Sequence, residues 1–170
     1  MKPFSVNKES YYTTGEFSKV CTVYKHCGPT AITNVLLILG ARGNAEDIFR
    51  EVVALGKRRG FYVSLKKTKR LGGTSDFLAG LYLRLTLKKY GLSSHKVRFG
   101  GVARSRALAK ALDEGKIIYL AVHFHPKYHN HHLLLYAQSK EGFRAADGWS
   151  KTPVVLSARD VRCALFYTIN

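Results

Sequence analysis

The sequence predicts an α+β protein in which helices come first and an antiparallel sheet follows. Apolar residues recur at helical spacing before position 115, and runs of β-forming residues separated by short turns follow it. With 170 residues, 46% of them hydrophobic, the chain is long enough to bury an extensive core. Since no long polar linker interrupts the pattern, we expect a single domain over residues 1–170.

Four helices are predicted, after an irregular lead-in over residues 1–20. The most apolar helix has Pro29 in its first turn, where a missing N–H costs nothing, and it ends at Gly40. Ser75 and Asp76 are suitable N-terminal caps for the third helix. The predicted segments are 31–39, 45–55, 75–90 and 105–114.

After Gly115 the chain has runs rich in β-branched, aromatic and aliphatic residues, which predict strands. The short turn Lys140-Glu141-Gly142 predicts a hairpin between the second and third of them. The predicted strands are 117–124, 132–137, 143–146, 153–156 and 163–169.

Lysine and arginine dominate the charge, with 28 of these residues against 11 Asp and Glu, which gives a formal net charge of +17. Such a charge attracts anionic partners, so we expect contact with an anionic polymer or a membrane surface, without sequence-specific nucleic acid binding. The composition excludes a disordered or collagen-like chain, and no apolar run is long enough to span a membrane. The N-terminus lacks the apolar core of a secretory signal, which predicts a cytoplasmic protein or a trimmed mature one.

The most basic segment is 57–70, in which seven of 14 residues are Lys or Arg. It is either a solvated surface loop or a polyanion contact in which Phe61 and Tyr62 stack on the ligand. We favour general electrostatic attraction.

Cys27 has the best position for chemistry among the three cysteines, which are too few for a disulfide framework. It precedes Gly28-Pro29 at the start of the apolar helix, where the helix dipole favours a thiolate and the backbone N–H groups are free to donate. The alternative interpretation is an inert buried cysteine.

A histidine and an acid follow in one predicted hairpin. His131 and His132 open one strand, and Asp147 ends the next, 16 residues after His131. Antiparallel pairing brings the start of the first strand beside the end of the second, so Asp147 can orient a histidine that faces Cys27. The alternative for Asp147-Gly148 is an ordinary turn.

These three blocks resemble those of papain-like cysteine peptidases, and most closely the bacterial double-glycine leader peptidases and their free-standing relatives. The blocks are Cys27-Gly28-Pro29-Thr30-Ala31, the run 130–137 and Ala146-Asp147-Gly148-Trp149. The resemblance implies a papain-like fold, in which a central helix that starts at the cysteine packs on a C-terminal antiparallel sheet. It also implies a thiol hydrolase that acts on a peptide or protein as a monomer, without cofactor or metal.

By position, Cys27 resembles the family's nucleophile, His131 its general base and acid, and Asp147 its orienting acid. His132 falls where the family usually has an aromatic residue, which favours His131. Gly72-Gly73 and Gly100-Gly101 are double glycines like those such peptidases cleave, but we assign them to loop geometry.

One position departs from the family pattern. The family has a glutamine six residues before the cysteine, which completes the oxyanion hole; here that residue is Cys21. Thr22 or Tyr24 could supply a replacement hydroxyl, or Cys21 and Cys27 could exchange a disulfide. Two other functions therefore remain open: a peptidase-like binding module with weakened catalysis, and a polyanion-binding protein.

The histidines also allow a metal site. Five of them fall within ten residues, and His123 and His125 would share one face of a regular strand. No recognised zinc spacing is present, which favours the peptidase interpretation.

Overall fold

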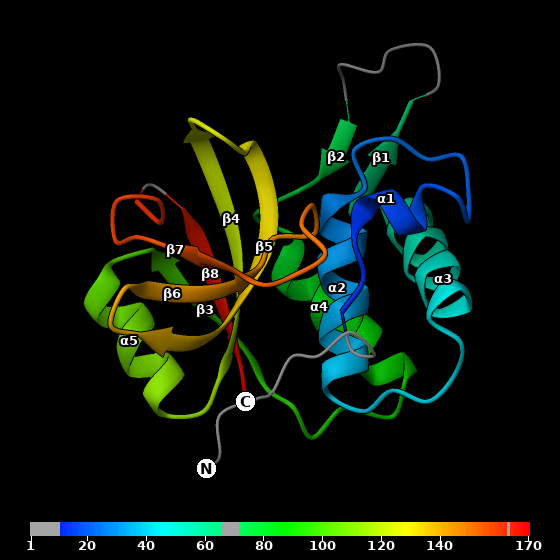
Figure 1. Ribbon diagram of the computed structural model, residues 1–170. Helices are drawn as coiled ribbons and strands as arrows, with labels where there is room; N and C mark the ends of the chain where they lie inside the picture. The colour runs from blue at the N-terminus through cyan, green and yellow to red at the C-terminus, as the bar shows by residue number, and fades with distance from the viewer. Residues whose placement is uncertain (1–10, 66–71, 163) are drawn as a thin grey trace.

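The computed structural model describes residues 11–65, 72–162 and 164–170. Most of the helices lie on one side of the molecule and a six-stranded antiparallel sheet lies on the other, as Figure 1 shows. The helix α2 packs on the sheet and contacts α1, α3 and α4, whereas α5 packs on the other face of the sheet, against β4 and β5. The predicted α+β arrangement is confirmed.

Each of the four predicted helices is present, preceded by a short extra one in the lead-in. The central helix α2 begins at Cys27, as the resemblance implied, four residues before the start of the segment predicted from the apolar run. Among the described residues, none of the helices has the length and hydrophobicity needed to cross a membrane. The helices are α1 (Thr14–Phe17), α2 (Cys27–Ile38), α3 (Ala45–Arg58), α4 (Ala79–Lys89) and α5 (Ser105–Asp113).

The prediction of caps at Ser75 and Asp76 is wrong, because α4 begins only at Ala79, with Leu78 as its N-cap. The carboxylate of Asp76 lies within 3.4 Å of the ring nitrogens of two histidines of the sheet, His123 and His132, instead of capping the helix. Tertiary contacts have therefore displaced the local capping preference.

The main sheet has the order β3-β8-β4-β5-β6-β7, and β1 pairs with β2 as a separate two-stranded sheet. The β5–β6 hairpin turns at residues 140–142 as predicted. The C-terminal strand β8 returns to pair with β4, between it and β3. The strands are β1 (Tyr62–Ser64), β2 (Gly72–Thr74), β3 (Val97–Val102), β4 (Ile117–His125), β5 (His129–Ser139), β6 (Gly142–Ala146), β7 (Val154–Leu156) and β8 (Leu165–Ile169).

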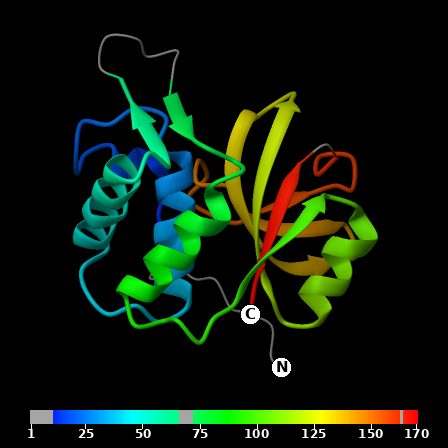
Figure 2. The same cartoon turned by 180° about the vertical axis from the view of Figure 1, so that it is seen from behind.

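Three strands were not predicted. The strands β1 and β2 have three residues each, too few for a periodicity to show. The edge strand β3 carries Gly100 and Gly101, which have low β-propensity, and its pairing with β8 shifts between Phe99 and Gly101. It lies next to α4, on the side of the molecule seen in Figure 2.

The two faces of the main sheet bury separate hydrophobic clusters. Tyr119 and Leu134 belong to the cluster that includes α2, α3 and α4. Leu120 and Leu133 belong to the cluster that includes Leu108 of α5. Because neighbouring side chains on a strand point to opposite faces, the nearly continuous apolar runs of β4 and β5 serve both clusters.

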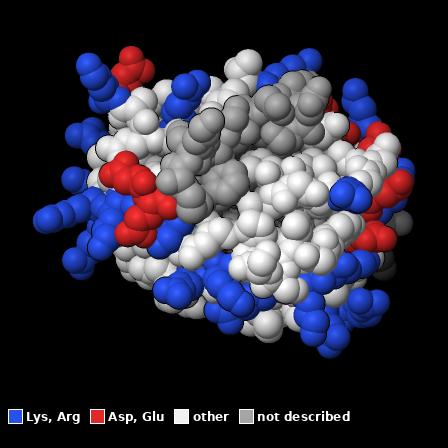
Figure 3. Space-filling model, turned by 90° about the horizontal axis from the view of Figure 1, so that it is seen from below, with Lys and Arg blue, Asp and Glu red and all other residues white. Residues whose placement is uncertain are grey.

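Basic side chains gather along the edges of the face shown in Figure 3, which looks at the molecule from below. The predicted stacking of Phe61 and Tyr62 on a polyanion is wrong, because these rings are 5% and 1% exposed in the core. Lys57 and Arg58 belong to the last turn of α3. Residues 66–70 of the basic segment lie outside the described residues.

Candidate active site

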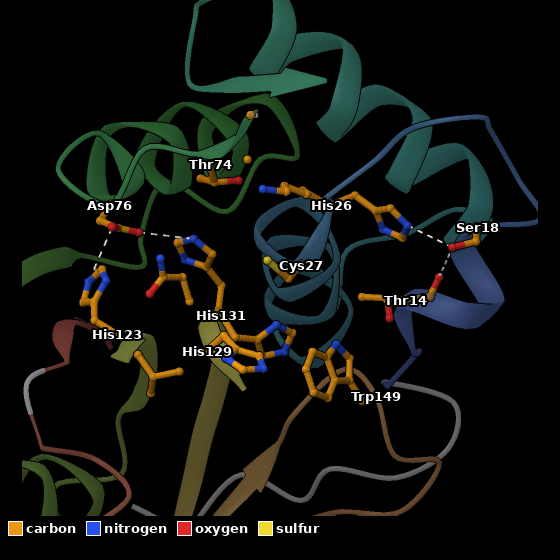
Figure 4. Close-up of a pocket in the computed structure, with 16 residues that line it drawn as sticks. Thr14, Ser18, His26, Cys27, Thr74, Asp76, His123, His129, His131 and Trp149 are labelled. Carbon is orange, nitrogen blue, oxygen red and sulfur yellow. Dashed lines mark hydrogen bonds and ion pairs between the residues drawn. The ribbon is translucent and has the colours of Figure 1, made fainter. Parts of the chain in front are cut away.

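A cleft of about 600 Å³ lies where the first turn of α2 meets β2, the β4–β5 hairpin and the loop after β6. Cys27, His131 and His132 all line it, and Asp147 lies directly behind His131. In Figure 4, Cys27 points into the cleft, with His131 and Trp149 on one side and Asp76 on another. The fold therefore brings together residues that are more than a hundred positions apart in the sequence.

Cys27 is the first residue of α2, and its side chain is only partly exposed. Burial raises the pKa of its thiol, while the main-chain N–H groups of His132, Gly28 and Cys27 itself lower it by smaller amounts. The net pKa lies above the ordinary value, so the expected low thiol pKa at the helix N-terminus is not what the structure gives. A base is therefore needed to generate the thiolate.

His131 has the hydrogen bonding that such a base requires. Its Nε2 lies 2.6 Å from the carbonyl oxygen of Asp147, which can only accept, so Nε2 carries the proton. Nδ1 has no hydrogen-bond partner in the described part of the chain and is left with its lone pair. Burial lowers the pKa of His131, which keeps the ring neutral near pH 7.

Aromatic rings hold His131 in place. The ring centroids of His131 and Trp149 are 4.6 Å apart. The ring of Tyr128 also stacks on His131, with the two centroids 5.5 Å apart. His131 is 3% exposed as a result. Its orientation is fixed by packing as well as by the hydrogen bond.

Asp147 acts on His131 through its main chain, whereas the resemblance implied its carboxylate. Oδ1 accepts the N–H groups of Trp149 and Ser150 at 2.9 and 2.7 Å, which closes a tight turn. Oδ2 accepts the hydroxyls of Tyr128 and Ser150, both at 2.9 Å. Burial raises the pKa of this carboxyl, but these hydrogen bonds outweigh it and the pKa is lowered. The carboxylate thus stabilises the loop that presents the carbonyl to His131.

The N-terminal segment joins this loop to the start of α2. The hydroxyl of the buried Tyr11 donates to the carbonyl of Ser150 at 2.5 Å and lies 3.4 Å from Asp147 Oδ1. Thr14 N–H donates to the carbonyl of Gly148 at 2.6 Å. Ser18 Oγ lies 3.0 Å from Nε2 of His26, the residue before Cys27. No sequence motif indicated this role for the lead-in.

His132 differs from its neighbour because both of its ring nitrogens are occupied. Nδ1 lies 2.8 Å from the hydroxyl of Tyr119, and Nε2 lies 3.2 Å from Oδ1 of Asp76. Burial lowers the pKa of His132 to about 3. A neutral ring with no free nitrogen cannot take a proton from Cys27.

Asp76 was missed as a site residue in the sequence. Its carboxylate lies 3.2 Å from His132 and 3.4 Å from His123, and it lines the cleft. Burial raises the pKa of Asp76, and the neighbouring His123 lowers it by a smaller amount. The only sequence signal was its likeness to a helix cap, which indicates a different role.

The histidine cluster does not form a metal site within the described residues. The β4–β5 pairing shifts between Val122 and His125, so the expected common face of His123 and His125 is wrong. His123 pairs with Asp76, whereas Nε2 of His125 lies 3.4 Å from Asp160. Within the cluster, His123 and His132 thus share Asp76, and His125 faces a different acid.

The residues considered as substitutes for the family's oxyanion glutamine do not line the cleft. Cys21, Thr22 and Tyr24 are not among the described residues that line the cleft. Cys21 and Cys27 are both free thiols. Thr74 of β2 lines the cleft and covers Gly28 so closely that a Cβ there would lie 2.1 Å from its Oγ1. A glycine is therefore required directly after the cysteine.

Comparison with known proteins supports the fold. No protein-family model matches the chain, and no curated protein matches it. A solved structure of a putative C39-like peptidase from Bacillus anthracis is similar over 100% of this chain and 98% of its own, with a TM-score of 0.59 and 11% identity.

The peptidase domain of Streptococcus ComA, described as a bi-functional ABC transporter involved in quorum sensing, is also similar. The match covers 85% of this chain and 90% of that domain, with a TM-score of 0.54 and 16% identity. In both comparisons the similarity extends over the helices and the sheet. The chain therefore has the fold of the papain-like cysteine peptidases, in its C39-like form.

Proposed function

We propose that this protein is a thiol hydrolase that cleaves a peptide or a related acyl bond, with Cys27 as nucleophile and His131 as general base. One observation carries the proposal: in the cleft that Cys27 lines, His131 has Nε2 held by a carbonyl and Nδ1 free. C39-like neighbours with the same fold support the reaction class.

The reaction begins with two neutral groups, because the pKa of the thiol is raised and that of His131 is lowered. Nδ1 of His131 takes the proton from Sγ of Cys27 as the sulfur attacks the acyl carbon. His131 then gives this proton to the leaving amine, and a thioester remains on Cys27. Water attacks the thioester while His131 accepts one of its protons, and the returning proton restores the thiol.

The N–H groups at the start of α2 stabilise the charge on the acyl oxygen in this scheme. Cys27 N–H is the first of these donors, as expected for a nucleophile at a helix N-terminus. A second donor is typically worth about 10²- to 10³-fold in rate. Since Cys21 occupies the place of the glutamine and does not line the cleft, we expect slow turnover.

Comparison of Cys27→Ala with the parent tests the proposal. Hydrolysis of p-nitrophenyl acetate and of a mixed fluorogenic peptide library is measured with both, and with Cys21→Ala as the matched control. We expect Cys27→Ala to lose turnover and Cys21→Ala to keep it. Equal turnover by Cys27→Ala and the parent would show that Cys27 is not the nucleophile.

A peptide-binding module without catalysis is the second candidate, favoured by the raised pKa of Cys27 and by the position of Cys21. Labelling with iodoacetamide at pH 7 and 9, read by mass spectrometry for each cysteine, separates the two. A hydrolase requires that labelling of Cys27 depends on His131. A Cys27 that resists the reagent at both pH values, in a protein that still binds peptides, indicates the binding module.

A further inference from the structure

A second cavity lies away from the cleft, between the end of α4 and the start of β3. Its volume is about 510 Å³. Five of the eight residues that line it are basic, and none is acidic: Arg84, Lys88, His95, Lys96 and Arg98. The other three are Leu87, Ser93 and Val97, of which Leu87 and Val97 are buried. We name this cavity the α4–β3 groove.

Arg84 is held rigidly at the groove. Its Nε and Nη2 donate to the carbonyl oxygen of Val97 at 3.2 and 2.9 Å, which connects α4 to β3. Within the described residues, Nη1 makes no hydrogen bond to the protein. A guanidinium fixed by main-chain contacts loses little conformational entropy when it binds an anion.

The neighbouring cations are exposed and lack an acidic partner. Lys88, Lys96 and Arg98 make no ion pair with a carboxylate of the described chain. The adjacent Lys89 provides a contrast, because its Nζ lies 2.8 Å from Glu51. Of these two successive lysines of α4, Lys89 is therefore neutralised by Glu51, whereas Lys88 lines the groove.

Four permanent cations that converge on one cavity repel each other unless an anion occupies it. Their combined charge exceeds that of a single carboxylate and matches an anion that carries several charges. Guanidinium and ammonium groups together are typical of phosphate recognition. Figure 3 shows further Lys and Arg side chains on the face seen from below, which would guide such an anion toward the protein.

We propose that the α4–β3 groove is a binding site for a chain of phosphate groups, either a free oligophosphate or the phosphodiester backbone of a polymer. Arg84 and Lys88 contact it from the helix, and Lys96 and Arg98 from the strand. The site is independent of Cys27, because the groove and the cleft share no lining residue.

Calorimetric titration with sodium tripolyphosphate and with a ten-nucleotide oligothymidylate tests this site. The double variant Lys88→Gln/Arg98→Gln removes two groove cations, and Arg106→Gln/Lys110→Gln on α5 removes the same charge from another exposed surface. We expect the groove variant to bind at least about tenfold more weakly and the α5 variant within about twofold of the parent. The dependence of log K on log salt should decrease by about one to two in the groove variant.

The two titrants distinguish the source of the phosphate. Binding of tripolyphosphate alone identifies a small oligophosphate ligand, and binding of both identifies a site that also accepts a phosphodiester backbone. Equal losses in the two double variants would overturn the proposal, since they would mean attraction by net charge alone. Binding by neither titrant above a sodium chloride control of equal ionic strength would overturn it as well. Thermal melting of each variant confirms that it is folded.

Discussion

In the cleft that Cys27 lines, the two neighbouring histidines His131 and His132 have opposite hydrogen-bonding patterns. On the Trp149 wall, formed by His131 and Trp149 with Asp147 behind them, the imidazole has one nitrogen bonded to a carbonyl and one free. On the Asp76 wall, formed by His132 and Asp76 with Tyr119 behind them, both nitrogens of the His132 ring are bonded. The comparison teaches that burial alone does not distinguish a base from a structural histidine. The pattern of partners on the two ring nitrogens does.

The largest expected effect is on the Trp149 wall. His131→Ala should lower the rate of Cys27-dependent hydrolysis by about 10²- to 10⁴-fold, because it removes the proposed base. His132→Gln is the matched variant of the adjacent residue, and its amide can still donate to Asp76. Steady-state kinetics of both, with thermal melting to confirm folding, measures the contrast. A greater loss in a folded His132→Gln than in His131→Ala would reverse the two roles.

A smaller effect is expected in the pH dependence of stability, on the Asp76 wall. His132 has a folded pKa of about 3 against an ordinary 6.5, so the unfolded chain binds a proton that the folded one does not. The free energy of unfolding is therefore unaffected by this histidine above about pH 6.5. Below that pH it decreases by about 1.4 kcal/mol per pH unit, until the pH approaches the folded pKa of about 3.

Urea unfolding at pH 7, 6 and 5 measures this loss. In His132→Gln the decrease between pH 7 and 5 should be shallower than in the parent. His95→Gln removes an imidazole far from the cleft and serves as the control. If the free energy of unfolding changes with pH equally in the parent and in His132→Gln, His132 is not held neutral in the folded protein.

The smallest effect concerns the support behind the Trp149 wall. Tyr11→Phe removes the hydroxyl that bonds Ser150 and approaches Asp147. We expect about 1 kcal/mol less stability and a rate roughly three- to tenfold lower, with KM unchanged. Tyr12→Phe is the control, since Tyr12 bonds Asn34 through its main chain. If the two variants have the same kcat, Tyr11 does not position the site.

Local sequence predicted the elements that carry a clear period. The apolar helix over 31–39 and the β5–β6 hairpin are both found, because an apolar run between a proline and a glycine, and a short polar turn, are local signals. The edge strand β3 was missed, since its two glycines and exposed side chains follow no such period. Its position is decided by pairing with β8, at the other end of the chain.

Among the site residues, too, those marked by a local motif were predicted, and those defined by long-range contacts were not. Cys27, His131 and Asp147 were selected by motif and spacing, and the fold places them around one cleft. Asp76 was not selected, because its histidine partners lie 47 and 56 positions later and no local pattern marks a carboxylate–imidazole contact over that separation. Tyr11 was missed for the same reason. Long-range polar contacts of this kind depend on the complete fold.

The acceptor for His131 is a main-chain atom, and this affects how the site can change in evolution. A substitution at position 147 alters the turn without deleting the acceptor oxygen, because every amino acid carries a carbonyl. Related sequences could thus retain the imidazole orientation while showing no acid at the aligned position. A search for an invariant Cys, His and Asp would then pass over functional relatives, and the shape of the loop would be the more dependable guide.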